Sequence, residues 1–267
     1  HFVIDFEDSP LAERLGKFKN LSLSDETIRE EFGISDNSMW SMSKARKAFD
    51  KQPIQNHLFV DLLYRPYDIR RTYYDKNVIF NMREQVMTHL IGGDNPALLT
   101  TRQTKETWSV LAAKSIVGHK ATAMYDVTSV FPLYIKQADT GLFGDGRKIN
   151  FATLFVDLLK NSFKQTDGLS IKLKAEDIFN YIYGVFHSPT YRSRYEGFLK
   201  RDFPKIPVPL SYALFQELSK LGDQLLQRHC LKFAATAEKK INFVGSRDSE
   251  VDKVSYSDET VWINKAK

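Results

Sequence analysis

The segment around residue 180 is apolar on two faces, which predicts a buried helix. Apolar side chains recur every three or four positions along it, at Ile178, Tyr181, Ile182 and Val185 on one face and at Phe179, Tyr183 and Phe186 on the other. This spacing is typical of an α-helix, and a helix that is apolar on two faces is buried in its fold. Ser188 and Pro189 predict the end of this helix and the start of another, because serine caps helix N-termini and proline fits the first helical turn.

The helix expected after Pro189 is basic on one side. Its apolar side holds Tyr191, Tyr195, Phe198 and Leu199, and its basic side holds Arg192, Arg194, Lys200 and Arg201. Prolines then space residues 203–209, and the residue before a proline is restricted to extended backbone. The pattern therefore predicts a buried helix, a basic helix and a stiff extended segment in succession.

The rest of the chain alternates between strand and helix patterns. Strands are expected at residues 2–6, 58–64, 97–101, 108–111, 115–117 and 130–135, with a hairpin at 251–263. Helices are expected at residues 9–18, within 24–50, at 82–90, at 151–158 behind an Asn150 cap, and at 211–229. This mixture predicts an α+β fold over residues 1–267, with a candidate seam at 141–148 between a sheet-rich half, 1–140, and a helical half, 149–267.

Composition limits the class of protein only loosely. The 267 residues are 42% hydrophobic and 13% aromatic, which is enough for a sizeable core. The net charge of +5 permits nucleic-acid binding without requiring it. A single cysteine, Cys230, excludes an internal disulfide framework and favours the reducing cytoplasm. No stretch approaches the ~20 apolar residues of a membrane span, and we expect neither such a span nor a signal peptide.

Several short motifs follow one another along the chain. They are residues 2–6, the sequence Tyr-Arg-Pro-Tyr-Asp-Ile-Arg at 64–70 with Tyr-Tyr-Asp at 73–75, and residues 98–103, 131–134, 147–151 and 178–209. In this order they resemble segments of the C-terminal specificity domain of type ISP restriction-modification enzymes, and the resemblance spans nearly the whole chain. The family usually continues past the region that corresponds to residues 261–264, so we expect a fragment of a larger protein.

The resemblance implies a non-catalytic target-recognition domain for double-stranded DNA. In the family, this domain presents a short asymmetric site to a methyltransferase domain that modifies adenine, and it signals to a motor and a nuclease. S-adenosylmethionine, ATP and magnesium would serve those covalently attached domains, and we expect no cofactor in this chain. A monomer in the cytoplasm, without a membrane partner, is expected. The alternative is a structural or interaction domain that couples the methyltransferase to its neighbours and contacts DNA weakly.

Candidate base contacts lie at the end of an expected strand. Arginine and glutamine make bidentate contacts to guanine and adenine in the major groove. No acid precedes Glu106 in this segment, whose candidates are Thr101, Arg102, Gln103 and Lys105. The following polar stretches could extend the same surface with Lys114, His119 and Lys120. The alternative for residues 101–105 is an ordinary polar turn.

Candidate phosphate contacts come from two basic regions. The first supplies Arg71, Tyr73 and Lys76, and the second supplies Arg192, Arg194, Lys200 and Arg201. Between residues 191 and 205, five cations stand against two acids. The alternative for this second region is a solvated helix face. We expect Arg65 and Arg70 to be structural, because aspartates lie close to both in the sequence.

The sequence offers little support for catalysis. It has neither the Asn/Asp-Pro-Pro-aromatic motif of an amino-methyltransferase nor the phosphate-binding loop of a motor. A nuclease site could be drawn from Asp223, Glu238 and Lys240, but Asp223 falls inside a helical pattern. The histidines lack metal-ligand spacing, and we expect His187 to be a structural residue at the end of the buried helix.

Overall fold

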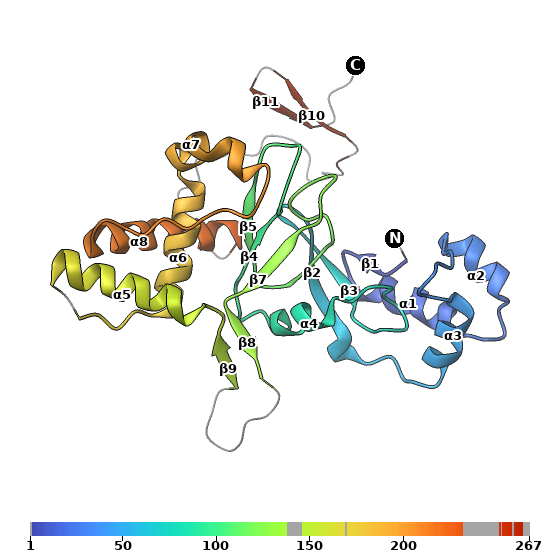
Figure 1. The fold of residues 1–267 in the computed structure, drawn as a ribbon. Coiled ribbons are helices and arrows are strands. Elements are labelled where there is room, and N and C mark those ends of the chain that lie inside the picture. Colours follow the sequence, from blue (N-terminus) through green and yellow to red (C-terminus); the bar gives the residue numbers. More distant parts are fainter. Residues whose placement is uncertain are drawn as a thin grey trace. The chain divides into compact units, whose positions relative to one another are not determined.

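The computed structural model describes residues 2–137, 146–168, 170–231, 251, 253–257 and 259–263. Contacts divide the chain into two units, His1–Lys232 and Phe233–Lys267. The second unit contains an antiparallel hairpin of β10 (Val254–Ser257) and β11 (Thr260–Ile263), which confirms the strands expected there. The other helices and strands belong to the first unit (Figure 1).

Helices and short strands alternate through the first unit, and the predicted α+β class is confirmed. The α-helices are α1 (Asp8–Lys19), α2 (Asp25–Phe32), α3 (Met42–Asp50), α4 (Glu84–Met87), α5 (Thr153–Asp167), α6 (Ala175–His187), α7 (Pro189–Leu199) and α8 (Tyr212–His229). The strands are β1 (Ile4–Asp5), β2 (Phe59–Arg65), β3 (Asp68–Tyr73), β4 (Ala97–Thr100), β5 (Val110–Ala113), β6 (Ile116–Val117), β7 (Ser129–Pro132), β8 (Tyr134–Lys136) and β9 (Arg147–Ile149).

Three small sheets form the middle of this unit. One sheet has the strand order β1-β3-β2-β6, with β2 and β3 joined as an antiparallel hairpin and β6 parallel to β2. A second sheet has the antiparallel order β5-β4-β7, in which Thr100 is opposite both Val110 and Ser129. The third is the β8–β9 pair. Alternating apolar residues from the first two sheets share one core, which includes Leu62, Leu99 and Val130.

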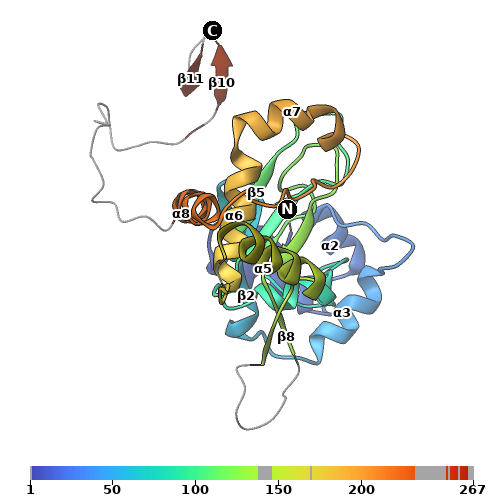
Figure 2. The same cartoon turned by 60° about the vertical axis from the view of Figure 1, so that its left-hand side comes forward.

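The predicted buried helix is present as α6 and lies at the centre of the helical part. Ala175 and every residue from Ile178 to Phe186 are buried, because strands cover one side of the helix and α5, α7 and α8 cover the others (Figures 1 and 2). Ser188 accepts a hydrogen bond from the Tyr191 amide at 3.4 Å, and Pro189 is the first residue of α7. The serine-proline signal for a new helix is therefore confirmed.

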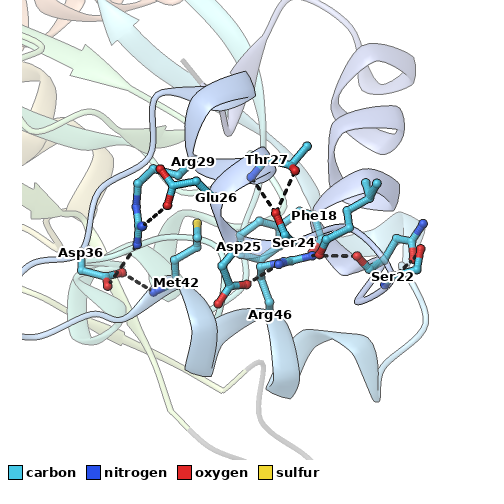
Figure 3. A network of polar contacts seen from close by, with 12 residues as sticks. Phe18, Ser22, Ser24, Asp25, Glu26, Thr27, Arg29, Asp36, Met42 and Arg46 are labelled. Carbon is cyan, nitrogen blue, oxygen red and sulfur yellow. Dashed lines mark hydrogen bonds and ion pairs between the residues drawn. The ribbon is translucent and has the colours of Figure 1, made fainter.

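The N-terminal helices α1, α2 and α3 form a separate apolar cluster with Phe59 and Tyr73 of the first sheet. Arg46 of α3 lies fully inside this cluster (Figure 3). Its guanidinium donates to the carbonyl oxygens of Phe18, Asn20 and Leu23 and to the Asp25 carboxylate. One arginine thus holds the α1–α2 connection against α3.

Some local predictions were wrong. Asn150 does not cap α5, because its side chain donates to the Pro132 carbonyl at 2.8 Å and Ala152 occupies the cap position. The helix expected at 82–90 is only α4 and a 3₁₀ turn, Thr88–Leu90, because Arg83 interrupts the backbone with a left-handed conformation at φ 50°. Strand β9 was not expected, since its sequence is rich in charged residues.

The candidate seam at 141–148 overlaps residues 138–145, which lie outside the described part of the chain. On its two sides, Trp108 and Val110 from the sheet-rich half pack with Phe179 and Phe186 from the helical half in one core. None of the described helices has both the length and the apolar character that a membrane span requires.

Candidate nucleic-acid interface

Three segments that are distant in sequence meet at one end of the β5-β4-β7 sheet. The turn 101–109 joins β4 to β5, and the loop 118–128 precedes β7. Both leave the sheet at the same end, because Thr100 is paired with Val110 on one side and Ser129 on the other. Residues 200–203, which follow α7, are the third segment; they lie beside the loops in Figures 1 and 2. We call these three segments the loop end.

Hydrogen bonds tie the three segments of the loop end together. The Thr104 amide donates to the Lys200 carbonyl at 3.0 Å, which joins the turn to the end of α7. The Ser109 hydroxyl donates to the Thr122 carbonyl at 2.8 Å, and the Glu106 carboxylate accepts from the Met124 amide at 3.2 Å. The loop end is therefore a fixed surface built on the sheet rather than a set of independent loops.

Most of the exposed predicted contacts belong to this surface. Of the contacts predicted in the turn and the loop, those whose side chains reach solvent are Arg102, Gln103, Lys105, His119 and Lys120. Just after α7, Arg201 is exposed and Lys200 is partly exposed. Arg194 is also exposed, but it lies in the middle of α7 and outside the loop end. The prediction that Lys114 extends the same surface was wrong, because Lys114 follows β5 at the opposite end of the sheet.

Arg102 has an acidic neighbour that the sequence did not reveal. Its Nε donates to Asp202 Oδ1 at 3.2 Å, although the two residues are 100 positions apart. The side chains are 71% and 68% exposed, so water screens this pair and it contributes little to stability. The pKa of Asp202 is held below its usual value by the Phe203 amide and by Arg102. A DNA phosphate or base edge could replace Asp202 as the partner of Arg102 with only a small loss of free energy.

Two predicted contacts are buried inside the protein. The Thr101 side chain is only 2% exposed at the strand end, and Tyr73 is 1% exposed in the N-terminal core. The Tyr73 hydroxyl accepts a hydrogen bond from the Gln55 amide at 3.1 Å, and burial raises its pKa. Neither side chain is accessible to DNA in this structure, which corrects both predictions.

Arg71 is held by the protein rather than presented to a partner. Its Nε donates to Asp8 Oδ1 and its Nη1 donates to Asp61 Oδ1, both at 2.6 Å, and its Nη2 donates to the Phe59 carbonyl. Asp8 and Asp61 together raise the pKa of Arg71 despite partial burial. The prediction of a phosphate contact is therefore corrected: the Arg71 side chain links α1 to β2 within the protein.

Arg192 is likewise structural, although it lies on the basic helix. Its Nε donates to the Phe186 carbonyl at 2.6 Å, its Nη2 lies 3.2 Å from His187 Nδ1, and its guanidinium carbon is 5.5 Å from the centre of the Trp108 ring. Burial lowers the pKa of Arg192. Its predicted phosphate contact is therefore corrected, since Arg192 fixes the α6–α7 junction.

The two arginines expected to be structural do make contacts within the protein. Arg70 forms the predicted ion pair with Asp68 at 2.9 Å. Arg65 donates instead to the carbonyl oxygens of Tyr64 and Lys120, at 3.0 and 3.2 Å, and so ties the β2–β3 turn to the loop 118–128. Lys76 lies beyond the other end of the hairpin, because Tyr73 is paired with Phe59 and Asp68 with Arg65. It is exposed but does not belong to the loop end.

Arg83 is a candidate contact that the sequence analysis missed. Its Nη1 donates to the Thr128 carbonyl at 3.2 Å at the base of the loop 118–128. Burial lowers its pKa, and among the described residues no carboxylate pairs with it. It lines a cavity of about 460 Å³ together with His119 and Gly118. A partly buried guanidinium without an acid is suited to an anion, but nothing in the local sequence distinguishes it.

A histidine pair lies behind the α6–α7 junction. The Tyr183 hydroxyl is 2.6 Å from His229 Nδ1, and the His187 and His229 rings are 5.0 Å apart. Burial lowers the pKa of His187 to about 4, and the nearby Arg192 acts in the same direction. His187 is thus an uncharged part of the core near neutral pH, in line with the structural role expected of it.

In the described part of the chain, the geometry gives no support to the nuclease hypothesis. Asp223 of α8 accepts from the Gln227 side chain at 3.2 Å, as an ordinary helix residue would. Glu238 and Lys240, the other members of the nuclease hypothesis, lie outside the described residues. Within the described ranges, no group of three or more histidine, cysteine, aspartate or glutamate side chains is placed to hold a metal ion.

Comparisons with known proteins agree with this architecture. The family model described as the Type ISP C-terminal specificity domain matches residues 1–267. No curated protein matches the chain.

Three solved structures have a similar fold, each over 86% of this chain. They are a DrdV–DNA complex (TM-score 0.64, 21% identity), the ATP-dependent Type ISP restriction-modification enzyme LlaBIII bound to DNA (0.61, 20%) and a nuclease-deletion mutant of the Type ISP enzyme LlaGI with a DNA substrate mimic (0.55, 18%). The match spans only 22%, 15% and 17% of those chains, respectively.

Proposed function

Because the chain belongs to the family of Type ISP C-terminal specificity domains, we propose that it recognises a short sequence in double-stranded DNA on behalf of a larger restriction-modification enzyme. Structures of similar fold were determined with DNA bound, which supports DNA as the partner. In this proposal the chain itself is not catalytic. It directs adenine methylation and cleavage that are carried out by covalently attached methyltransferase, motor and nuclease domains.

The proposal of DNA recognition rests on the structure of the loop end. A surface that reads DNA needs side chains that reach base edges and cations around them that hold the backbone in register. The loop end offers Arg102 and Gln103 on a turn that hydrogen bonds anchor, with Lys105, Lys120 and Arg201 nearby. This combination of fixed backbone and exposed polar side chains suits sequence recognition better than a flat charged face does.

We assign different roles to different parts of the loop end. Arg102 and Gln103 would contact bases, because their forked side chains match guanine and adenine edges in the major groove. Lys200 and Arg201 would contact phosphates from just after α7, Arg194 from the helix itself, and Arg83 from its cavity. The Arg102–Asp202 pair would open when DNA binds, since the exposed pair is weak.

The parent enzyme would supply what the chain lacks. S-adenosylmethionine, ATP and magnesium would be used by the other domains, with the chain acting as a monomeric part of one cytoplasmic polypeptide. A supporting role in domain coupling is suggested by α5, where the apolar side chains of Leu154 and Leu158 are exposed one helical turn apart. Such a face suits contact with another protein domain rather than with DNA.

Removing two cations at the end of α7 should weaken binding in a way that depends on salt. Contact with about five phosphates predicts a log–log salt slope of roughly −4 to −5 for the whole chain. A Lys200→Gln, Arg201→Gln double variant should flatten the slope to about −3 and weaken binding to every duplex alike. Fluorescence anisotropy with a labelled duplex at several salt concentrations measures both effects.

Lys76→Gln is the matched control, because Lys76 is an exposed lysine outside the loop end. It should leave the slope and the affinity unchanged. A wild-type chain that binds without salt dependence, or a control that flattens the slope more than the double variant does, would contradict the proposed interface.

A further inference from the structure

The loop 118–128 ends in a tip of large apolar side chains. In this tip, residues 123–127, Met124 is 67% exposed and Tyr125 is 75% exposed, and Val127 is also exposed. The other exposed side chains of the same loop, His119 and Lys120, are polar or cationic. Large apolar groups exposed to water beside cationic side chains indicate a contact that is completed by a partner.

Hydrogen bonds close the neck of the loop and leave the tip projecting. The hydroxyls of Thr122 and Thr128 are 3.1 Å apart, and both side chains are buried. The Thr122 amide donates to the Thr128 hydroxyl at 3.1 Å, and the Thr128 amide donates to the His119 carbonyl at 2.9 Å. These contacts fix where the loop begins and ends, but they do not fix the tip itself.

Glu106 fixes the tip. Its carboxylate accepts from the Met124 amide at 3.2 and 3.3 Å and from the Tyr125 amide at 3.2 Å. Glu106 belongs to the turn that carries Arg102 and Gln103, so one carboxylate couples the apolar tip to the proposed base-reading turn. A carboxylate on a DNA-facing surface repels phosphate. The hydrogen bonds from two backbone amides give Glu106 a positioning role that offsets this repulsion.

We propose that Met124 and Tyr125 contact the 5-methyl group of a thymine in the major groove and that Glu106 positions them to do so. The proposal rests on the proposed function. Apolar side chains recognise thymine through this methyl group, which is the only apolar feature that a base pair presents in that groove. The cations of the loop end would hold the phosphates, and the exposed Met124 and Tyr125 would then face the bases; the one charged residue of the tip, Asp126, is only partly exposed.

The test begins with the site that the wild-type chain selects from a pool of duplexes with a random core. Each thymine of the selected site is then replaced by deoxyuridine, which lacks only the methyl group. One replacement should weaken wild-type binding about fourfold, the effect expected for one methyl group removed from contact. In Met124→Ala and Tyr125→Ala, thymine and deoxyuridine duplexes should bind with more nearly equal affinity, with the wild-type salt slope retained.

Matched variants separate positioning from folding. Met39→Ala removes an equally exposed methionine, 76% exposed and far along the chain between α2 and α3, and should keep full discrimination. Glu106→Ala should lose discrimination, whereas Glu106→Gln retains an amide oxygen that accepts from the tip amides and should keep part of it. Unchanged unfolding temperatures would show that these differences do not reflect loss of the fold.

The outcomes distinguish this proposal from the one on which it rests. If the wild-type chain selects no sequence, the proposed function fails. If it selects a site and every thymine-to-deoxyuridine replacement is neutral, or if both tip variants discriminate as well as wild type, thymine contact by the tip is overturned and DNA recognition stands. In that case the exposed tip would more reasonably contact another protein domain.

Discussion

Gly222→Ala should severely destabilise the helical part of the protein. An added Cβ at this position of α8 would lie 1.8 Å from the Asn180 carbonyl oxygen and 2.7 Å from its carbon. A similar clash, at 2.6 Å from the Leu218 carbonyl oxygen, would arise at Gly184 of α6. The two helices therefore touch backbone to backbone where they cross, and no flexible side chain is available to move aside. Separation of α8 from α6 would loosen a core that includes Tyr181 and Phe215.

We expect Gly222→Ala to lower the free energy of unfolding by about 3–5 kcal/mol, at or above the upper end for overpacked sites. Urea unfolding followed by far-ultraviolet circular dichroism measures this loss. Gly16→Ala is the control, since a Cβ at this helical position of α1 meets nothing within 4 Å. It should be stabilising by ~0.5–1 kcal/mol because alanine favours a helix more than glycine does. Equal effects of the two variants would show that the α6–α8 crossing is not close-packed.

Arg46→Ala should be the second substitution that greatly lowers the free energy of unfolding. Arg46 is 1% exposed, and its removal leaves the carbonyls of Phe18, Asn20 and Leu23 without their donor. The substitution also leaves the Asp25 carboxylate without its cationic partner and opens a cavity in the N-terminal cluster (Figure 3). Breaking a buried charged network in this way costs about 3–5 kcal/mol. Because these helices are distant along the chain from the loop end, the remaining folded fraction should keep its affinity for DNA.

Arg29→Ala is the matched control, and it removes an arginine from the same helical cluster. Arg29 pairs with Glu26 at 3.1 Å and with Asp36 at 3.5 Å, but its side chain is 39% exposed (Figure 3). Exposed ion pairs contribute less than about 1 kcal/mol, so this variant should unfold nearly as wild type does. Thermal unfolding of both variants measures the difference. A larger loss for Arg29→Ala than for Arg46→Ala would contradict the role given to burial.

The sequence was informative where the signal was local. The repeat of apolar residues on two faces predicted α6, and the adjacent Ser188 and Pro189 predicted where α7 begins. Both signals act within a few residues of the chain. Asn150 carries an equally local signal, but its side chain bonds to Pro132 on another strand, so a tertiary contact overrode the capping preference.

The roles of the arginines could not be predicted because their partners are distant in sequence. Arg71 is bound by Asp8, 63 positions away, and Arg102 by Asp202, 100 positions away. Arg192 falls on the basic side of the expected helix, but its guanidinium turns back onto the carbonyl that ends α6. Whether an arginine faces DNA or the protein therefore depends on chain packing rather than on local charge.

The candidate site was predicted in part for the same reason. Arg102, Gln103, Lys105, His119 and Lys120 were singled out by residue type, and strand pairing brings them to one end of the sheet. The contribution of Glu106 and the exposed tip was not predicted. A glutamate next to a lysine and a Met-Tyr pair in a loop are common, and only their contact makes them a unit.

Hydrogen exchange of the wild-type chain tests most directly whether DNA binds at the loop end. Exchange would be compared with and without an excess of the duplex that the chain selects, at low salt. We predict slower exchange at residues 102–109, 119–127 and 199–203, with no change in α1, α2 and α3 or around Lys76. Protection centred on those N-terminal helices or on α5, with the three segments of the loop end unchanged, would contradict the account.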